Sequence, residues 1–502
     1  MGKDPTDHFK QTERLAVALK RRSVYEWIVT KGYYPESYVL PPCFQVVKHP
    51  HFGKVYFPNL KKKFKFAQYL EVPFPKTELI DRTFRIIDPE LHSDIAYIIA
   101  RNWKTILKCL FDQKNKVCSY SFPIPLSAEN PGEIGKLRSG RMIYEYIEMA
   151  ENDIASIAYN YKCLIKTDIA NFYPSVYTHS IPWAIHGKKT IRKKRNRTDF
   201  RFFGNRLDKL IQCANDDCTV GIPIGPVVSD LISEIILAKV DKQLSKHINE
   251  KFFVARFKDD YRILAKSESD GKHLLKIFQS ILKEYKLELN ISKTEFFKLP
   301  DGLFRNWVSQ YHSVNPRPRA MYSYKRFKEV YLSVITIDRQ NPGTGVIDRF
   351  LADIATSKDG LRVFINKRTL PKLISLLIML ADLRTKAFPK VLAIIDSVLI
   401  TPLGKEHSDD IAKYLVDLLG TLSENESGNE YLISWIWYFL RANRFEKKIT
   451  FKTKYRDEVV RSSYSSRSAI FKKCKDFILF RGIRSTAKDI NLLSHLDVFK
   501  PQ

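Results

Sequence analysis

Long apolar segments are scarce in this chain of 502 residues. The most apolar run, Leu373–Ala381, covers about half of a bilayer span before Asp382 ends it. The first 20 residues are charged and polar, and they lack the apolar centre of a secretory signal. We therefore expect neither a membrane helix nor a signal peptide.

Cysteines and acidic residues are also in short supply. Seven scattered cysteines, an odd number, do not form the pattern of a disulfide framework, so we expect a reducing, cytoplasmic setting. No close cysteine pair is followed by a matching Cys or His pair, so we expect no zinc site. Because 84 Lys and Arg outnumber 55 Asp and Glu, the formal net charge is +29. Such a surplus attracts polyanions, and nucleic acid or nucleotides are the leading partners.

The apolar patterns divide the chain into three expected regions, and the class is α+β. Residues 1–120 predict short helices joined by ordered loops, one of them the proline-rich stretch Val72–Lys76. Residues 121–330 mix strand-like runs with helices. Residues 331–502 predict an all-α region, either a HEAT-like stack or a plain bundle. Its expected helices are Gly345–Thr356, Leu370–Thr385, Phe388–Ile400, Asp409–Leu422 and Glu430–Ala442.

Three elements of the middle region carry the functional signal. The runs Leu164–Ile169 and Phe252–Phe257 are rich in strand-forming residues, and carboxylates lie at or beside their ends. Between them, Val227–Leu244 has the apolar period of a helix.

An acidic pair, Asp259-Asp260, falls in the turn of a predicted hairpin. Two like charges held together repel each other, and a divalent metal would neutralise them. Taken alone, the pair also fits an ordinary acidic turn.

Three further features make the acidic pair part of a larger pattern. Asp168 ends the earlier strand, and the loop Gly221–Ser229 opens the helix between the strands. Glycine lets backbone approach a substrate because it has no side chain in the way. Lys293 supplies a basic residue after the next helix. We expect these four features, which are Asp168, the glycine loop, the acidic pair and Lys293, to form one site.

These four motifs together resemble the reverse transcriptases. Asp168–Tyr173 resembles their first palm motif, Gly221–Ser229 the second, Phe257–Asp260 the third and Asn290–Thr294 the fourth. Asp168–Ser180, with Ala184–Gly187, is similar to the bacterial defence branch of this family. Within that branch, the long helical C-terminal region resembles the abortive-infection polymerases of the shorter, prophage-borne type. The resemblance implies fingers and a palm, followed by a helical domain in place of a thumb.

The resemblance also implies roles for individual residues. Asp168 and Asp259 would hold two Mg²⁺ ions, or Mn²⁺ in their place, with Asp260 assisting. Tyr173 would screen the sugar and favour dNTPs. Lys293 would neutralise the leaving phosphate. Lys258, inside the third motif, departs from the family: its cation would lie beside the metals or the primer-end phosphate, unless the side chain points out of the hairpin. The remaining expected substrate contacts are Gly221, Pro223 and Gly225 of the loop, and Arg138 and Arg141 of the fingers.

One departure from the family concerns the template. Template-copying relatives commonly carry a polar glutamine before the glycine loop, whereas this chain has Val220, which cannot hydrogen-bond a sugar or template. Basic runs that flank the palm are expected to follow a phosphate backbone, although a charge run is usually a solvated loop. The expected nucleic-acid contacts are Lys61, Lys62, Lys63, Lys65, Lys193, Lys194 and Arg195.

The sequence thus favours a DNA polymerase that uses dNTPs. The resemblance further implies abortive-infection defence against phage, a homo-oligomer, and untemplated single-stranded DNA attached to the protein through a tyrosine. Two alternatives stay open: a template-copying reverse transcriptase with an associated RNA, and a non-catalytic nucleic-acid-binding scaffold. The candidate priming residues are Tyr25, Tyr33, Tyr34 and Tyr38.

Overall fold

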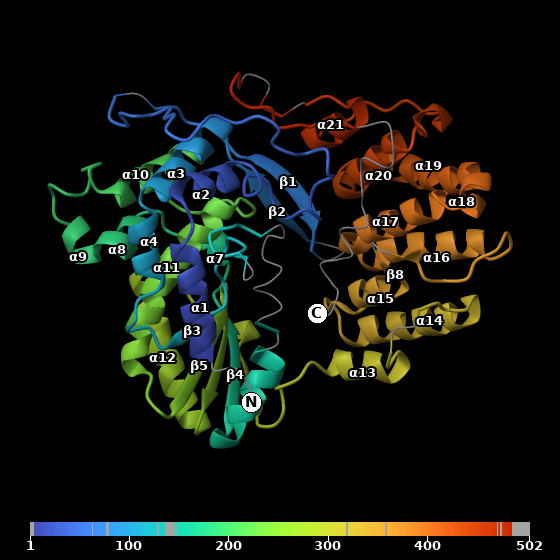
Figure 1. The fold of residues 1–502 in the computed structure, drawn as a ribbon. Helices are drawn as coiled ribbons and strands as arrows, with labels where there is room; N and C mark the ends of the chain where they lie inside the picture. The colour runs from blue at the N-terminus through green and yellow to red at the C-terminus, as the bar shows by residue number, and fades with distance from the viewer. Residues whose placement is uncertain are drawn as a thin grey trace.

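The computed structural model describes residues 5–62, 64–76, 80–127, 130–135, 146–147, 149–317, 320–356, 359–468, 470–471 and 474–483. Two bodies lie side by side in it (Figure 1). One contains a five-stranded sheet with helices packed against it, and the other is a stack of helices from the second half of the chain. The hairpin β1–β2 lies where the two bodies meet. Among the described residues, no helix is both long and apolar enough to cross a membrane.

The N-terminal region contains the predicted short helices and one hairpin that was not predicted. The stretch Val72–Lys76, expected to be a loop, lies mostly in strand β1, with Pro73 opposite Thr83 and Pro75 opposite Asp81. A two-stranded ribbon tolerates proline because each strand has an outer edge that needs no donor. The elements are α1 (Pro5–Val17), α2 (Arg21–Val29), β1 (Leu70–Pro75), β2 (Asp81–Ile86), α3 (Pro89–Arg101) and α4 (Trp103–Leu110).

The central sheet has the strand order β3-β5-β6-β4-β7. Strand β3 runs parallel to β5, and the other neighbours are antiparallel. Both predicted strands are confirmed, as β4 and β5. The strands are β3 (Val117–Ser119), β4 (Cys163–Asp168), β5 (Phe252–Phe257), β6 (Asp260–Ala265) and β7 (Glu295–Lys298).

The predicted central helix is confirmed with the same bounds, as α11 (Val227–Leu244). It is apolar on nearly all sides and almost entirely buried, as expected of a helix inside a core. The other elements of this body are the π-helical turn η1 (Met149–Asp153), α6 (Ile154–Ile157), α7 (Phe172–Ser175), α8 (Ser180–His186), α9 (Lys188–Ile191), α10 (Phe203–Ala214), α12 (Glu268–Glu284), and the 3₁₀ turns η2 (Ala158–Asn160), η3 (Ser245–His247) and η4 (Ile291–Lys293).

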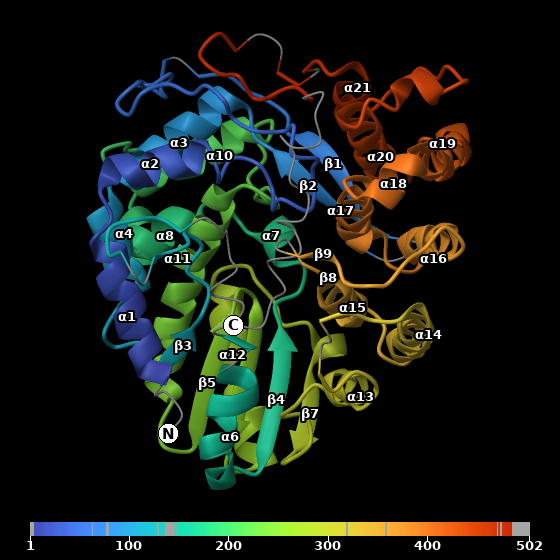
Figure 2. The same ribbon diagram turned by 45° about the vertical axis from the view of Figure 1, so that its right-hand side comes forward.

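The C-terminal body is a series of helices stacked one above another (Figure 2). All five predicted helices are present, shifted by at most two residues at either end. A ribbon of two-residue strands, β8 (Ala355–Thr356) and β9 (Gly360–Leu361), is a small exception to the helical pattern. The helices are α13 (Asn306–Val314), α14 (Tyr324–Gln340), α15 (Val346–Ile354), α16 (Leu370–Leu383), α17 (Phe388–Leu399), α18 (Pro402–Glu406), α19 (Ser408–Glu424), α20 (Glu430–Ala442) and α21 (Glu458–Ser465), with the 3₁₀ turns η5 (Thr385–Ala387) and η6 (Glu446–Lys448).

The protein has two large apolar cores, and each of them combines segments that lie far apart in the sequence. One joins the C-terminal helices to the segment from Tyr33 to Ile86, which includes the β1–β2 hairpin. The other joins the N-terminal helices α1–α4 to the central sheet and α11. The N-terminal region is therefore shared between both bodies.

A buried ionic network ties α11 to the β5–β6 hairpin. Arg256 of β5 is 1% exposed, and its Nη1 and Nη2 donate to both carboxylate oxygens of Glu234 at 2.8 and 3.0 Å. Its Nε donates to Asp241 at 2.9 Å, and Tyr261 of β6 donates to the same carboxylate at 2.8 Å. Arg256 Nη1 also donates to the backbone oxygen of Lys258 in the hairpin turn at 3.0 Å. Each buried charge has partners, as it must in a medium of low dielectric.

Replacing Arg256 should unfold this junction. The substitution Arg256→Ala would leave Glu234 and Asp241 as buried, uncompensated carboxylates. We expect a loss of about 3–5 kcal/mol in the free energy of unfolding, measured by denaturant titration followed by tryptophan fluorescence. The exposed Arg368 is the matched control, and Arg368→Ala should change stability by less than about 0.5 kcal/mol. Equal losses in both variants would contradict a structural role for the network.

Candidate active site

Three carboxylates meet at one end of the central sheet. Asp168 is the last residue of β4, and the strand register sets it directly opposite Asp260, the first residue of β6. Asp259 precedes Asp260 in the turn from β5, and its backbone oxygen accepts from Ile169 N at 3.3 Å. The arrowhead of β4 ends below α7 in Figure 2. The antiparallel pairing of β4 with β6 thus joins residues that lie far apart in sequence.

The hairpin turn is held from both sides. Lys258 adopts a left-handed backbone conformation, with φ of +53°, which non-glycine residues take up only when surroundings enforce it. Its N–H donates to Ser121 Oγ at 2.5 Å, while its carbonyl accepts from Arg256. These two bonds fix the position of the following Asp259.

Burial, together with the neighbouring negative charges, raises the pKa values of Asp259 and Asp260. Desolvation, followed by the charges of Asp259 and Asp168, raises the pKa of Asp260 to about 6, although its side chain reaches solvent. Desolvation chiefly, with a contribution from Asp168, also raises the pKa of Asp259. A raised acid pKa means that the ionised group destabilises the folded chain at neutral pH. A bound cation would reverse this effect.

Asp168 has one oxygen occupied and one free. Its Oδ2 lies 3.1 Å from Lys293 Nζ, whereas its Oδ1 is buried without a hydrogen-bond partner. The side chain is 13% exposed. A buried carboxylate oxygen without a donor is costly, and a cation would satisfy it.

The donor set fits Mg²⁺ better than a metal that needs a full protein cage. Within the described ranges, no three His, Cys, Asp or Glu side chains form a ready-made metal cluster. Mg²⁺ is usually bound by one or two carboxylates together with substrate phosphates and water. Asp168 and Asp259, with Asp260 beside them, can supply those carboxylates when a phosphate is present.

The glycine loop is packed against the N-terminal segment. Gly221 and Gly225 both have positive φ values, +92° and +128°, and Pro223 between them is buried. A Cβ on Gly225 would lie 3.0 Å from the Pro35 ring. A Cβ on Gly32 would lie 2.3 Å from the first side chain of α11, which excludes any side chain there. The segment around Gly32 and Pro35 therefore reaches the palm.

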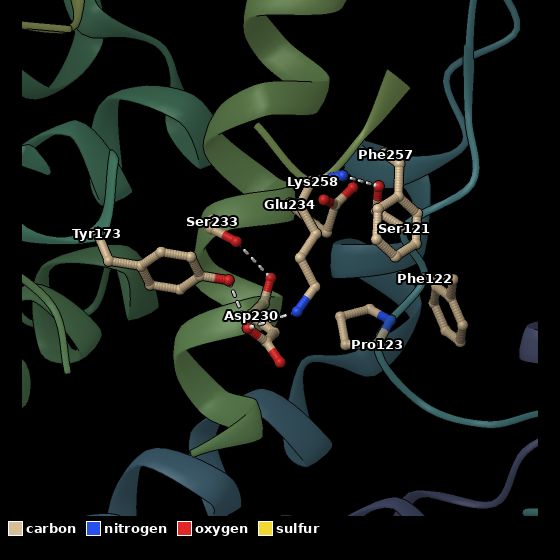
Figure 3. Close-up of a pocket in the computed structure, with 9 residues that line it drawn as sticks. All are labelled: Ser121, Phe122, Pro123, Tyr173, Asp230, Ser233, Glu234, Phe257 and Lys258. Atoms are coloured by element: carbon tan, nitrogen blue, oxygen red, sulfur yellow. Dashed lines mark hydrogen bonds and ion pairs between the residues drawn. The ribbon is translucent and has the colours of Figure 1, made fainter. Parts of the chain in front are cut away.

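A small pocket lies beside the turn of the β5–β6 hairpin (Figure 3). Tyr173 lies on one side of it, and the segment Ser121–Pro123, which follows β3, lies on the other. The half-buried Tyr173 donates through its hydroxyl to Asp230 Oδ1 at 2.5 Å. Lys258 Nζ lies 3.9 Å from the same oxygen, so this side chain turns toward α11. The pocket is lined by Ser121, Phe122, Pro123, Tyr173, Asp230, Ser233, Glu234, Phe257 and Lys258.

Sequence reasoning missed the supporting residues of this site. Asp230, Glu234 and Asp241 lie on α11, and Arg256 lies within an apolar strand. A signal was present, because acidic residues inside an otherwise apolar helix need partners. The spacing of four and seven residues places the three acids toward one side of the helix. Arg256, the basic residue inside the apolar strand β5, pairs with two of these acids, Glu234 and Asp241.

The two basic runs come together on the surface. Lys61 and Arg195 both line an open pocket of about 530 Å³, with Arg201 and Arg206 beside them. Lys62, Lys193 and Lys194 are exposed. Lys65 differs, because it pairs with Asp88 at 2.8 Å and Glu90 at 2.6 Å. Lys63, Arg138 and Arg141 lie outside the described residues.

Three of the four candidate priming tyrosines are buried. Tyr25 shares a hydrogen bond with Ser93 at 2.9 Å, Tyr33 donates to the Ile87 backbone at 2.7 Å, and Tyr34 donates to the Leu479 backbone at 2.5 Å. Burial raises the pKa of each of these hydroxyls. Tyr38, at 39%, is exposed. A nucleophile must reach its substrate, so the geometry ranks Tyr38 first among these four.

Residues 101–325 match the family model described as reverse transcriptase (RNA-dependent DNA polymerase). This part of the chain is a reverse transcriptase domain. The domain contains all three carboxylates and the glycine loop, and it indicates a nucleotidyltransferase of the polymerase kind.

Several solved structures resemble the chain at low identity. Apo telomerase from Candida tropicalis is 12% identical, with 78% of this chain and 71% of that chain covered and a TM-score of 0.35. Telomerase from Candida albicans in complex with the TWJ fragment of telomeric RNA is 9% identical, with 73% and 68% covered and a TM-score of 0.29. Among curated proteins, none matches the chain.

Removing one of the crowded charges should stabilise the metal-free protein. Because the pKa of Asp260 is raised to about 6, Asp260→Asn should raise the melting temperature in EDTA at pH 8, where the carboxylate is ionised. The gain should shrink at pH 5, where the folded protein already holds the proton. Differential scanning fluorimetry at both pH values measures this. Asp301→Asn, at an exposed acid, is the control, and an equal gain there would remove the repulsion argument.

Proposed function

We propose that the chain is a DNA polymerase that joins dNTPs at Asp168, Asp259 and Asp260. The observation that carries this proposal is the register of β4 against β6, which sets two carboxylates opposite each other within a reverse transcriptase domain. The unpartnered Oδ1 of Asp168 supports a role in cation binding. An inert scaffold would have no reason to retain carboxylates whose ionisation is unfavourable.

The chain's own side chains suggest a division of roles. Asp168 and Asp259 would hold Mg²⁺, with Asp260 assisting. When bound, the metal would lower the pKa of the attacking hydroxyl and stabilise the leaving pyrophosphate. Lys293, 3.1 Å from Asp168, can neutralise phosphate charge beside the carboxylates. The hydrogen bond to Asp230 holds the ring of Tyr173 still, as a steric screen against a ribose 2′-hydroxyl requires.

The proposed synthesis is independent of a template. Val220 precedes the glycine loop and is 55% exposed, so an apolar side chain is presented where a polar one would bind template or sugar. The alternative is a reverse transcriptase that copies an associated RNA. The shared basic pocket of Lys61 and Arg195 favours that alternative, because such a surface can bind a nucleic-acid backbone.

The proposal includes protein priming and a defence role. Both rest on the resemblance to abortive-infection polymerases, which also implies a homo-oligomer and a single-stranded DNA product. Tyr38 is the first tyrosine to test, since its ring is exposed. Attack by its hydroxyl on the α-phosphorus of a dNTP would form a phosphodiester and release pyrophosphate.

Incorporation without a template tests the function. Purified protein with Mg²⁺ and each labelled dNTP should yield a labelled polymer that stays with the protein on denaturing electrophoresis until protease releases it. Asp259→Asn should reduce incorporation by several orders of magnitude, because a neutral amide cannot replace an anionic ligand. EDTA should have the same effect on the wild type.

Each part of the proposal has its own contrary result. Full activity of Asp259→Asn would reject the assigned site. Product that migrates free of protein would reject protein priming, and copurified RNA of defined sequence that is copied into DNA would favour the templated alternative. Tyr38→Phe, which removes only the hydroxyl, separates Tyr38 from other primers.

Sugar selection at Tyr173 gives a second test. Tyr173→Ala removes the ring and should admit rNTPs, whereas Tyr173→Phe keeps the ring, loses only the bond to Asp230, and should retain most discrimination. The ratio of dNTP to rNTP kcat/KM measures the effect. Unchanged selectivity in Tyr173→Ala would assign the screen to another residue.

A further inference from the structure

A cluster of cations lies where the fingers hairpin meets the C-terminal helices. The 3₁₀ turn η5 joins α16 to α17 and contacts β1 of the hairpin. Arg384, Lys386 and Lys390 flank or lie in this turn, and Arg82 stands on β2. The hairpin points into the space between the two bodies (Figure 1).

One buried carboxylate serves two of these cations. Asp348 of α15 forms ion pairs with Lys390 and with Arg384, whose Nη2 lies 3.5 Å from it. Arg384 is 9% exposed, and its buried Nε has no hydrogen-bond partner. Asp348 is thus already shared, and a buried guanidinium donor remains unsatisfied.

Lys386 has no counter-ion of its own. In the described part of the chain it forms no ion pair, although it is only partly exposed. Burial, together with the charge of Arg384 and the smaller effects of Lys390 and Arg82, lowers the pKa of Lys386 to about 8, and the charge of Asp348 offsets only part of this shift. Asp338 of α14 is the second acid near the cluster, and burial raises its pKa. Among the side chains that the structure describes here, Arg82, Arg384, Lys386 and Lys390 therefore outnumber Asp348 and Asp338.

One of these cations also acts on the active site. The exposed Arg82 acts electrostatically on both Lys386 and Asp259, so it lies within electrostatic reach of the cluster and of the β5–β6 turn. Helix α17 begins at the cluster without a side-chain cap, and its first amides add partial positive charge. An anion bound here would reduce the repulsion among the four cations and would accept hydrogen bonds from their unsatisfied donors.

We propose that Arg82 and Lys386, together with the buried Arg384 and Lys390, form a phosphate-binding subsite shared between the β1–β2 hairpin and the C-terminal helices. This inference rests on the proposed polymerase function and deepens it. The ligand is a phosphate group of the polymerase's own substrate or product, either in the backbone of single-stranded DNA or in the triphosphate of a dNTP.

Two charge-removing variants test the subsite. Lys386→Gln and Arg82→Gln are compared with Lys413→Gln, at an exposed lysine of α19. Binding of a fluorescent 12-nucleotide single strand is measured by anisotropy across a salt series, and the KM for dNTP is measured in extension assays. Each variant should either weaken single-strand binding or raise the KM for dNTP, by about fivefold. Where a strand contact is lost, the slope of log K against log salt should also fall by about 0.7.

The two measurements distinguish a phosphate of the DNA backbone from the triphosphate of a dNTP. A weaker strand affinity with unchanged KM assigns the subsite to the DNA backbone, and a raised KM with unchanged affinity assigns it to the triphosphate. Wild-type-like values in both arms would overturn the subsite. Strand binding needs no catalysis, so a wild type that binds but never incorporates would reject the proposed function alone.

The melting temperature of Lys386→Gln shows whether Lys386 binds a ligand or instead stabilises the fold. Burial and the neighbouring cations outweigh the attraction of Asp348 and lower the pKa of Lys386, so Lys386→Gln should leave the melting temperature of the ligand-free protein unchanged or raise it. A fall in melting temperature that parallels the loss of binding would overturn the proposal.

Discussion

The buried guanidinium of Arg256 sets the geometry on which the site depends. Its bonds to Glu234 and Asp241 fasten β5 to α11, and its bond to the Lys258 carbonyl fastens the hairpin turn. Because the turn is fixed, Asp259 is held against the end of β4. A buried arginine with two carboxylates is stable only as a complete set, so the helix and the hairpin are positioned together or not at all.

That rigidity explains how the molecule tolerates an unfavourable site. Asp259 and Asp260 would move apart from Asp168 if their backbone were free to do so, since burial and the neighbouring negative charges oppose the ionisation of these two residues. The left-handed turn and the β4–β6 ladder prevent this movement. The same argument applies to Asp168 Oδ1, which is buried without a donor. A cation bound to these carboxylates would remove the unfavourable energy that the rigid backbone imposes on them.

Local signals in the sequence were sufficient for the elements that carry the carboxylates. The β4 and β5 strands and the α11 helix follow from strand propensity and from the helical period, which depend on neighbouring residues only. The β1–β2 hairpin was missed because Pro73 read as a loop residue, and its place in a two-stranded ribbon depends on Thr83 across the turn. Likewise, nothing near Lys65 in sequence indicated that Asp88 and Glu90 would bind it. Such partners are set by tertiary packing.

The division of the N-terminal region between two cores links the C-terminal helices to the polymerase body. Tyr33 and Phe84 pack in the core of the C-terminal helices, whereas Ile28, five residues before Tyr33, packs in the core of the palm. The intervening Gly32 lies against the start of α11 and leaves no room for a side chain. A shift of the C-terminal helices would therefore pull on both the hairpin and the glycine loop. The helical body thus acts on the site indirectly, since it packs against the β1–β2 hairpin, whose Phe84 lies beside Gly225 of the glycine loop.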